Sequence, residues 1–402
     1  MNILFLTIGR FADVSAHTIY CDLLRQFKSL GHNIYTVSPY EKRLGKKTSL
    51  DIEEGVNCLR VKIGNITKCG MIEKGISTLR IESQYKKAIK KYFKGVKFDL
   101  VIYSTPPITF CNVVKYIKKR DDAKSYLLLK DIFPQNSVDL GILRKSGVKG
   151  LIYKYFRRKE KKLYALSDRI GCMSKANCDY VIKNNPEVDS KKVEVCPNSV
   201  EYVDMSLKLE QRMDMRKKYE LPLDKKIFVY GGNLGKPQSI PFVIECLKTQ
   251  KDNKDAFFLI VGDGTEYCKL EQYIKKENPE NVKLMQRLPK DDYDRMVAAC
   301  DVGMIFLDKR FTIPNFPSRL LAYMQAGVPV FACTDKNTDV GQVVVENGFG
   351  WWCESSEPQT FANKIEEIMA TDTSAMPIKM KEYFLQNYTV EKSCQIILNG
   401  LE

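Results

Sequence analysis

Short apolar runs alternate with amphipathic segments along the whole chain. Residues 2–8 are mostly Ile, Leu and Phe, which predicts a strand buried on both faces. Apolar side chains recur at helical spacing through residues 15–30, and Gly31 stands where a helix usually ends. The next predicted strand covers residues 33–38 and stops at Pro39. This order of strand, helix and parallel strand predicts an α/β fold.

The same order continues to the end of the chain. A charged stretch with little strand pattern, residues 199–225, separates two sets of elements. The sequence therefore predicts two doubly wound domains, residues 1–200 and 201–376, followed by a helical segment over residues 377–402. Further strands are predicted at residues 98–103, 125–130, 169–173, 193–196, 227–230, 257–261, 302–306 and 328–332.

The net charge of +15 is unevenly distributed. Residues 1–200 hold 38 Lys and Arg against 19 Asp and Glu, whereas residues 201–402 hold 26 against 30. A basic first half indicates an anionic partner, although a solvated basic surface and nucleic-acid binding also fit the charge. The 13 scattered Cys predict free thiols in a reducing cytoplasm, and only two His argue against a His-ligated metal or a Ser-His-Asp triad. No run approaches the ~18 apolar residues of a membrane-spanning helix.

Glycines follow two predicted strands of the second half. Gly231 and Gly232 precede Asn233 and Lys236, and this setting favours contact with phosphate, although a tight turn explains it too. The spacing does not match a P-loop. A second turn, residues 262–264, consists of Gly262, Asp263 and Gly264.

A third candidate is the predicted helix over residues 319–326. Ser318 is a suitable N-cap and Gly327 a suitable residue just after the end. The helix start and the charge of Arg319 together predict an anion site, for which a diphosphate is a natural occupant. The apolar loop before it, with Asn315, Phe316 and Pro317, is predicted to form a ligand wall.

At this helix the sequence resembles a known family. Residues 315–330 read NFPSRLLAYMQAGVPV, which is similar to the P-S-K-L-x-E-Y-M-x-A-G-x-P-V signature of family 4 glycosyltransferases. Weaker matches occur in order at residues 130–135, 164–170, 195–200, 230–235, 261–264 and 299–303. The subset that it looks like builds bacterial capsule and O-antigen polysaccharide.

The resemblance implies a GT-B fold, in which two Rossmann-like domains face a cleft and no metal or other cofactor is bound. It implies a nucleotide-sugar donor, UDP-linked by preference, on the second domain, and a polyprenyl-diphosphate-linked saccharide acceptor on the first. We expect Gly232, Asn233, Lys236, Ser318 and Arg319 to bind the donor diphosphate. Asn315, Phe316 and Pro317 are expected beside the sugar, and the last helix is expected to return to the first domain. The residues expected around the base and ribose are Gly262, Asp263, Gly264, Arg287 and Leu288.

The chain departs from the family pattern at several positions, among them the N-terminal glycine loop, which is absent. The two family Glu fall on Pro314 and Ala322, and the Arg of the usual phosphate pair falls on Asn233. Lys236 and Arg319 must therefore carry more of the diphosphate.

The family retains anomeric configuration, and Asp131, after a first-domain strand, is our candidate for positioning the acceptor or removing its proton. His17 is the second candidate, and a simple turn role for Asp131 stays open. Asp292 and Asp294 have metal-like spacing, but a helix start explains them.

Two basic segments rich in aromatic residues, 84–94 and 153–163, suit an anionic bilayer surface. They predict peripheral attachment to the cytoplasmic face of the membrane, with no nucleic acid bound. The alternatives are a GT-B nucleotide-sugar epimerase and a non-enzymatic basic protein that binds nucleic acid or membrane.

Overall fold

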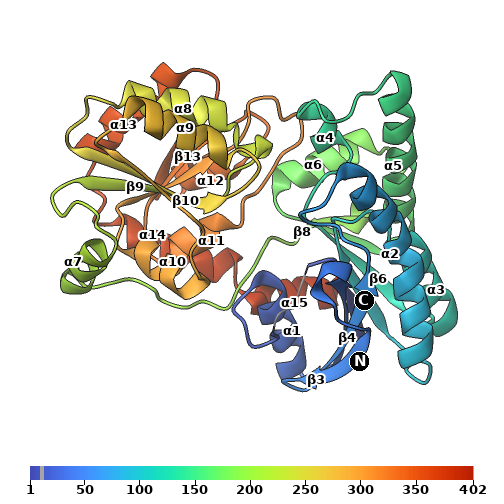
Figure 1. Ribbon diagram of the computed structural model, residues 1–402. Helices are drawn as coiled ribbons and strands as arrows, with labels where there is room; N and C mark the ends of the chain where they lie inside the picture. The colour runs from blue at the N-terminus through green and yellow to red at the C-terminus, as the bar shows by residue number, and fades with distance from the viewer. Residues whose placement is uncertain (10–12, 402) are drawn as a thin grey trace. The chain divides into compact units, whose positions relative to one another are not determined.

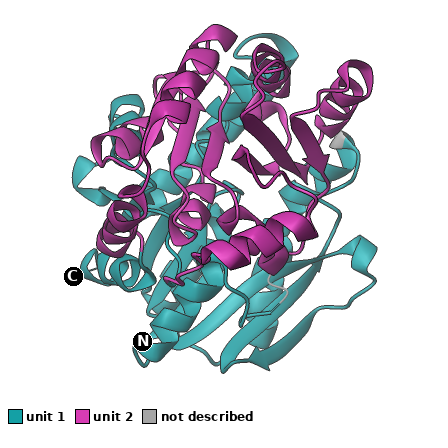
Figure 2. Cartoon of the chain, turned by 90° about the vertical axis from the view of Figure 1, so that its left-hand side faces the viewer, with its two compact units in different colours: residues 1–201, 389–402 teal, residues 202–388 magenta. Residues whose placement is uncertain are grey.

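The chain forms two compact units in a computed structural model that describes residues 1–9 and 13–401 (Figures 1 and 2). Unit 1 comprises residues 1–201 and 389–402, and unit 2 comprises residues 202–388. The chain leaves unit 1 one residue later than the predicted junction. The expected return of residues 377–402 was too long, because α14 (Met376–Asn387) stays in unit 2 and only the segment from Thr389 packs in unit 1.

Unit 1 is built on a mixed sheet whose strand order, over the described residues, is β3-β4-β2-β1-β5-β6-β7-β8. All neighbouring strands run parallel except β3 and β4, which form an antiparallel hairpin at one edge. Its strands are β1 (Asn2–Leu6), β2 (Asn33–Glu41), β3 (Ser49–Glu53), β4 (Val56–Ile63), β5 (Leu100–Ser104), β6 (Lys124–Leu129), β7 (Arg169–Cys172) and β8 (Val193–Val195).

Helices cover both faces of this sheet. α2, α3 and α5 lie side by side on one face, and α1 packs against α15 (Figure 1). The helices of unit 1 are α1 (Ile19–Ser29), α2 (Met71–Tyr92), α3 (Cys111–Asp121), α4 (Gln135–Asp139), α5 (Gly147–Leu166), α6 (Lys175–Asn184) and α15 (Val390–Asn399), with short 3₁₀ helices η1 (Lys42–Leu44) and η2 (Ser190–Lys192).

The prediction that Pro39 ends its strand was wrong, because β2 continues to Glu41. The Thr7 N–H donates to the Val37 carbonyl at 3.2 Å, so the backbone of Val37 faces β1. Pro39, two residues further on, faces the same side, where β1 has already ended at Leu6. The missing N–H of proline therefore costs no ladder bond, and β4 still pairs with the other side.

Unit 2 is built on a parallel sheet with strand order β11-β10-β9-β12-β13-β14 in the part described. Phenylalanines from adjacent elements, among them Phe228, Phe258, Phe331 and Phe361, fill the core against one face. The strands are β9 (Lys226–Asn233), β10 (Ala256–Asp263), β11 (Val282–Met285), β12 (Val302–Phe306), β13 (Val330–Thr334) and β14 (Gly350–Glu354). The helices are α7 (Leu209–Lys218), η3 (Lys236–Gln238), α8 (Ile240–Thr249), α9 (Tyr267–Glu277), α10 (Lys290–Ala298), α11 (Arg319–Gln325), α12 (Val340–Glu346), α13 (Pro358–Ala370) and α14.

Both sheets confirm the α/β prediction and place ligand-binding edges at the carboxyl ends of parallel strands. All 13 cysteines are free. None of the helices in the described residues combines the length and the hydropathy that crossing a membrane requires.

Candidate active site

The ends of β9 and β10 form the floor of the candidate site in unit 2. Asn233 pairs with Asp263 at the end of the ladder, and the Leu234 N–H donates to the Asp263 carbonyl at 2.8 Å. A Cβ added at Gly262 would lie 1.9 Å from the Gly232 carbonyl oxygen, and one added at Gly264 would lie 2.3 Å from that of Leu234. Only glycine fits at these positions, because the backbone at the end of β10 packs directly on the backbone at the end of β9. The two glycine-containing turns therefore form one continuous surface.

The sequence placed Gly231 and Gly232 in a loop, but β9 extends through both. A Cβ at Gly231 would lie 1.7 Å from the hydroxyl oxygen of Tyr293 on α10, so the strand needs glycine to admit that side chain. Gly232 has a φ of +124°, a region that glycine adopts at little cost.

Arg319 lies over this surface at the start of α11. Its guanidinium carbon is 4.1 Å from the centroid of the Tyr230 ring, within the range of a cation–π contact. A Cβ at Gly232 would be 3.2 Å from Nη2 of Arg319. Among the described residues, Nη1 of Arg319 and the hydroxyl of Tyr293 are both buried without a hydrogen-bond partner. The site thus holds an arginine whose donors are not fully used by the protein.

The neighbours of Arg319 are neutral aromatic groups. Burial raises the pKa of the Tyr323 hydroxyl to about 12, and burial also raises the pKa of Tyr293 and of Tyr230 above the usual value. These tyrosines therefore stay protonated near neutral pH, whereas a guanidinium keeps its charge. The positive charge of Arg319 has no carboxylate opposite it in the residues described.

Tyr323 fixes α11 to the sheet. Its hydroxyl donates to the Met304 carbonyl at 3.0 Å and lies 3.2 Å from that of Val229, and its ring covers Gly303. The predicted end of the helix is confirmed, because Gly327 has a φ of +64° just after the C-cap Ala326.

The prediction that Ser318 caps α11 was wrong. Its φ and ψ of −64° and −16° are helical, and its side chain makes no cap hydrogen bond. An N-cap needs an extended backbone to turn its hydroxyl toward the first N–H groups. Because α11 has only seven residues, the guanidinium of Arg319 is the main source of positive charge here. The role of Ser318 in binding a diphosphate stays a prediction.

The loop after β9 is held by Gln238. Its Oε1 accepts from the Asn233 side chain at 2.9 Å and from the Gly235 N–H at 3.2 Å. The Asn233 amide thus supports the loop. Lys236 is exposed at the first position of η3, and its contact with a phosphate stays a prediction.

The loop before α11 is fixed by two residues that the sequence analysis missed. Thr338 Oγ1 accepts from the Asn315 N–H at 3.0 Å and donates to Asp335 at 2.9 Å. Burial raises the pKa of the Asp335 carboxyl to about 6, although the hydrogen bonds that it accepts from Thr338 and Asn337 act to lower it. The available signal was the Asp-Lys-Asn-Thr turn at residues 335–338, a few residues beyond the predicted strand 328–332.

Phe316 is buried against the core, and its expected place beside the sugar stays a prediction. It is only 5% exposed, and its ring centroid lies 6.1 Å from that of Tyr388 in the core of unit 2. An apolar loop lowers its free energy by burying such side chains. Pro317 is half-buried, and its role stays a prediction.

Arg287 and Leu288 follow the edge strand β11, next to β10. Arg287 is exposed and Leu288 is half-buried. Their expected place near the base and ribose stays a prediction.

Asp131 follows β6 in unit 1, as predicted. Its two carboxylate oxygens accept from Asn136 Nδ2 at 2.7 and 2.8 Å, and its N–H donates to the Thr105 hydroxyl at 3.2 Å. Burial raises the pKa of the Asp131 carboxyl to about 6, although the bond from Asn136 opposes the shift. Such a carboxylate can accept a proton near neutral pH.

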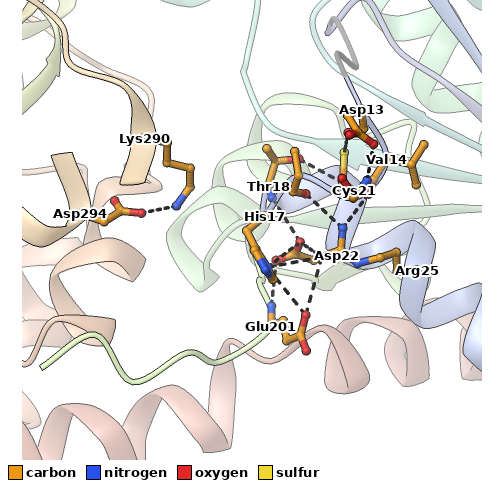
Figure 3. A network of polar contacts seen from close by, with 12 residues as sticks. Asp13, Val14, His17, Thr18, Cys21, Asp22, Arg25, Glu201, Lys290 and Asp294 are labelled. Atoms are coloured by element: carbon orange, nitrogen blue, oxygen red, sulfur yellow. Dashed lines mark hydrogen bonds and ion pairs between the residues drawn. The ribbon is translucent and has the colours of Figure 1, made fainter. Parts of the chain in front are cut away.

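His17 belongs to a different polar network, at the start of α1 (Figure 3). Its Nδ1 lies 3.8 Å from carboxylate oxygens of both Asp22 and Glu201, and the side chain is 57% exposed. Asp22 accepts from Arg25 and from the backbone N–H groups of Thr18 and Glu201. This network connects Glu201, the last residue of the first segment of unit 1, to α1. Within the described residues, His17 therefore shares no hydrogen-bond partner with Asp131.

The Asp292 and Asp294 pair is engaged by lysines. Asp292 accepts from Lys218 at 2.9 Å, and Asp294 pairs with Lys290 (Figure 3). Within residues 1–9 and 13–401, no group of three or more His, Cys, Asp or Glu is arranged to hold a metal ion.

Comparison with known proteins identifies the type of enzyme. Residues 211–386 match the family model described as glycosyl transferases group 1. The chain is 25% identical over 309 residues to the probable glycosyltransferase WbjE of Pseudomonas aeruginosa. This aligned region covers 75% of this chain and 74% of that protein. It is also 25% identical over 251 residues to the putative colanic acid biosynthesis glycosyl transferase WcaI of Escherichia coli, covering 61% of this chain and 60% of that protein.

The fold comparison covers the whole chain. The crystal structure of Anabaena Alr3699/HepE in complex with UDP aligns with a TM-score of 0.70 at 15% identity, over 100% of this chain and 99% of that one. Like its structural neighbours, the chain has two Rossmann-like domains. The protein is therefore a glycosyltransferase with the GT-B fold, and residues 211–386 are the part that is similar to the group 1 family model.

Proposed function

We propose that this glycosyltransferase moves a sugar from a UDP-sugar to a polyprenyl-diphosphate-linked saccharide in the synthesis of a cell-surface polysaccharide. The observation that carries the donor half of the proposal is Arg319, whose buried Nη1 has no partner in the described part of the chain. A buried donor without a partner costs free energy, which an anionic ligand would recover. The choice of UDP is supported by the aligned Anabaena protein, which was crystallised with it.

Cleavage of the sugar–diphosphate bond leaves negative charge on the departing diphosphate. Fixed donors aimed at that charge stabilise the transition state, because they need no reorganisation during the reaction. Arg319 offers a planar fork held by the ring of Tyr230, and Lys236 adds a flexible charge from the neighbouring loop. We propose that these side chains replace a metal ion and that the anomeric configuration is retained.

Unit 1 takes the acceptor in this proposal. Asp131 stands at the carboxyl end of β6, where ligands of parallel sheets bind, and its raised pKa suits a group that orients or deprotonates a hydroxyl. The E. coli relative is named for colanic acid biosynthesis, which supports a growing saccharide as acceptor. A lipid-linked acceptor places the enzyme at the cytoplasmic face of the membrane.

The test measures UDP and uridine binding by calorimetry. Arg319→Ala should weaken UDP binding at least about tenfold, since a hydrogen bond to a charged group contributes about 1.5–3 kcal/mol, and should leave uridine binding unchanged. Arg319→Lys should recover only part of the affinity, because lysine lacks the fork. Arg295→Ala, which removes an exposed arginine of α10, is the matched control. Equal losses for UDP and uridine would refute the role of Arg319.

The reaction itself is tested with a panel of radiolabelled UDP-sugars and a polyprenyl-diphosphate-linked disaccharide. Label should move to the lipid phase both with and without EDTA. Transfer that stops in EDTA and returns with Mn²⁺ would refute metal independence, and release of free sugar alone would refute transfer to the lipid.

A further inference from the structure

One side of α2 exposes apolar side chains in its first half and basic ones in its second. Ile72, Ile76 and Leu79 are 81%, 50% and 51% exposed. Continuing at the same alternating spacing of three and four residues, the side then carries Lys86 and Lys90. Residues at this spacing line one face of a helix.

α5 shows the same arrangement, with exposed apolar side chains in its first half and basic ones in its second. Val148, Ile152 and Tyr155 are 79%, 44% and 42% exposed along one face, and Leu151 beside them is 67% exposed. The same face then carries Lys159, whose Nζ lies 5.7 Å from the Tyr155 ring, and Lys162. Two helices of one unit thus share a pattern that folding of the unit does not explain, because burying these side chains would stabilise it.

The apolar ends of both helices lie at one edge of unit 1. α2 leads to β5 and α5 leads to β7, so each helix starts at the edge formed by the carboxyl ends of the parallel strands. Both pack against α3, which lies between them (Figure 1). The apolar band therefore borders the edge that carries Asp131, and the basic band lies behind it.

We propose that this surface, which we call the α2–α5 face, docks on a lipid bilayer that contains anionic lipids. The exposed Ile, Leu and Val side chains insert among the headgroups, and the lysines contact lipid phosphates. Charge complementarity favours this occupant, since α2 holds six Lys and Arg against two Glu, and α5 holds seven against one. A second copy of the same face would bring like charges together.

A groove within the basic band fits a lipid headgroup. It has a volume of about 410 Å³ between α2 and α3, and its lining includes Lys86, Lys115, Lys119 and Tyr116 together with Glu82, whose carboxylate accepts from Asn112. Lys86 and Lys90 each lie 5.1 Å from the Tyr116 ring, so an aromatic wall backs several positive charges. Three lysines against one carboxylate leave this groove with a net positive charge, which suits a phosphate with its attached glycerol.

The inference rests on the proposed function only in the choice of a lipid-linked acceptor. Docking by the α2–α5 face would bring the edge with Asp131 to the surface where a polyprenyl diphosphate is anchored. Binding to lipid is measured without donor or acceptor, and UDP affinity is measured without lipid, so failure of one proposal leaves the other standing.

The experiment is co-sedimentation of the full chain with vesicles of phosphatidylglycerol and phosphatidylcholine, compared with phosphatidylcholine alone. The wild type should bind only the anionic vesicles, and added salt should weaken binding. Ile72→Ser, Ile76→Ser and Leu79→Ser combined should lower the partition coefficient at least about tenfold. Lys86→Gln, Lys115→Gln and Lys119→Gln combined should remove the preference for phosphatidylglycerol.

The control is Leu209→Ser combined with Ile378→Ser, because these side chains of unit 2 are 73% and 65% exposed. This variant should bind as the wild type does. Each variant should keep the UDP affinity and the melting temperature of the wild type, which shows that it is folded. Wild-type binding by the Ile72/Ile76/Leu79 variant would overturn the proposal. So would a dimer that these substitutions dissociate, since the occupant would then be a second copy, or binding of a soluble polyanion equal to that of vesicles.

Discussion

Replacing Asp131 by Asn should make the protein more stable while impairing transfer. The carboxyl is half-buried, and burial raises its pKa from 3.8 to about 6. Folding therefore favours the protonated form, and ionisation of Asp131 destabilises the native state. An Asn side chain has the same shape, can still pair with Asn136, and never ionises.

The size of the effect follows from the shift. A rise from 3.8 to about 6, at 1.36 kcal/mol per unit, corresponds to at most about 3 kcal/mol. The sign is set by proton binding: between about pH 4 and pH 6 the native state holds more protons than the unfolded state. Wild-type stability thus falls as pH rises through this window, and the full cost is present above about pH 6. Asp131→Asn lacks this loss.

Thermal and urea unfolding of both proteins from about pH 4 to pH 8 is the assay. At about pH 7.5 the variant should melt several degrees higher, since 1 kcal/mol shifts the melting temperature of a domain this size by about 2–4 °C. The gap should close toward pH 4. A variant that is less stable than wild type at neutral pH would refute the reasoning.

Asp168→Asn is a matched control of opposite sign. Burial alone would raise the pKa of Asp168, but Lys118, 2.6 Å away, and Ser125 lower it below the usual value. Its charged form stabilises the fold at neutral pH, and that contribution is lost as pH falls through the lowered pKa. Asp168→Asn should therefore destabilise the protein at about pH 7.5, with a difference that shrinks in acid. Equal responses of the two variants would mean that local packing, and not charge, decides both.

Two further predictions concern the reaction. If Asp131 accepts the acceptor proton, kcat/KM should rise with pH through about 6 in the wild type and lose this limb in Asp131→Asn; a wild-type profile that is flat there would exclude the role. Gly232→Ala should weaken UDP binding about tenfold or more in calorimetry, because the residue has a φ of +124° and its Cβ would press on Arg319. Gly75→Ala, on an open face of α2, should leave that affinity unchanged.

The strands that could be predicted from sequence are those with contiguous apolar runs, which both faces of a covered sheet require. β12 matches the predicted residues 302–306, and the other predicted strands are found within a few residues. The β3–β4 hairpin was missed because β3 reads Ser-Leu-Asp-Ile-Glu and lies at an exposed edge. Its signal was the turn, where Glu54 and Gly55 have φ of +48° and +71°.

The candidate site was only partly visible for a different reason. Arg319 could be found because a charge at a helix start after a proline loop is informative on its own. Tyr230 and Tyr293 could not, because one lies in an apolar strand and the other follows helical periodicity, so both look like ordinary core residues. Their relation to Arg319 comes from the sheet, which brings β9 beside β12 and so places α10 and α11 over the same glycines.

The departures from the family pattern and the setting of Arg319 have one physical explanation. A Glu at position 322 would stand three residues after Arg319 on α11, the spacing at which opposite charges pair along a helix. Here that position is Ala322, and position 314 is Pro314, so neither supplies a carboxylate. Arg319 is stacked on Tyr230 instead, which holds the guanidinium in place without neutralising it. Without Glu at positions 314 and 322 the chain lacks two acceptors for ribose hydroxyls, but the charge of Arg319 also stays free to bind a diphosphate. Arg319 is therefore the most informative residue to substitute.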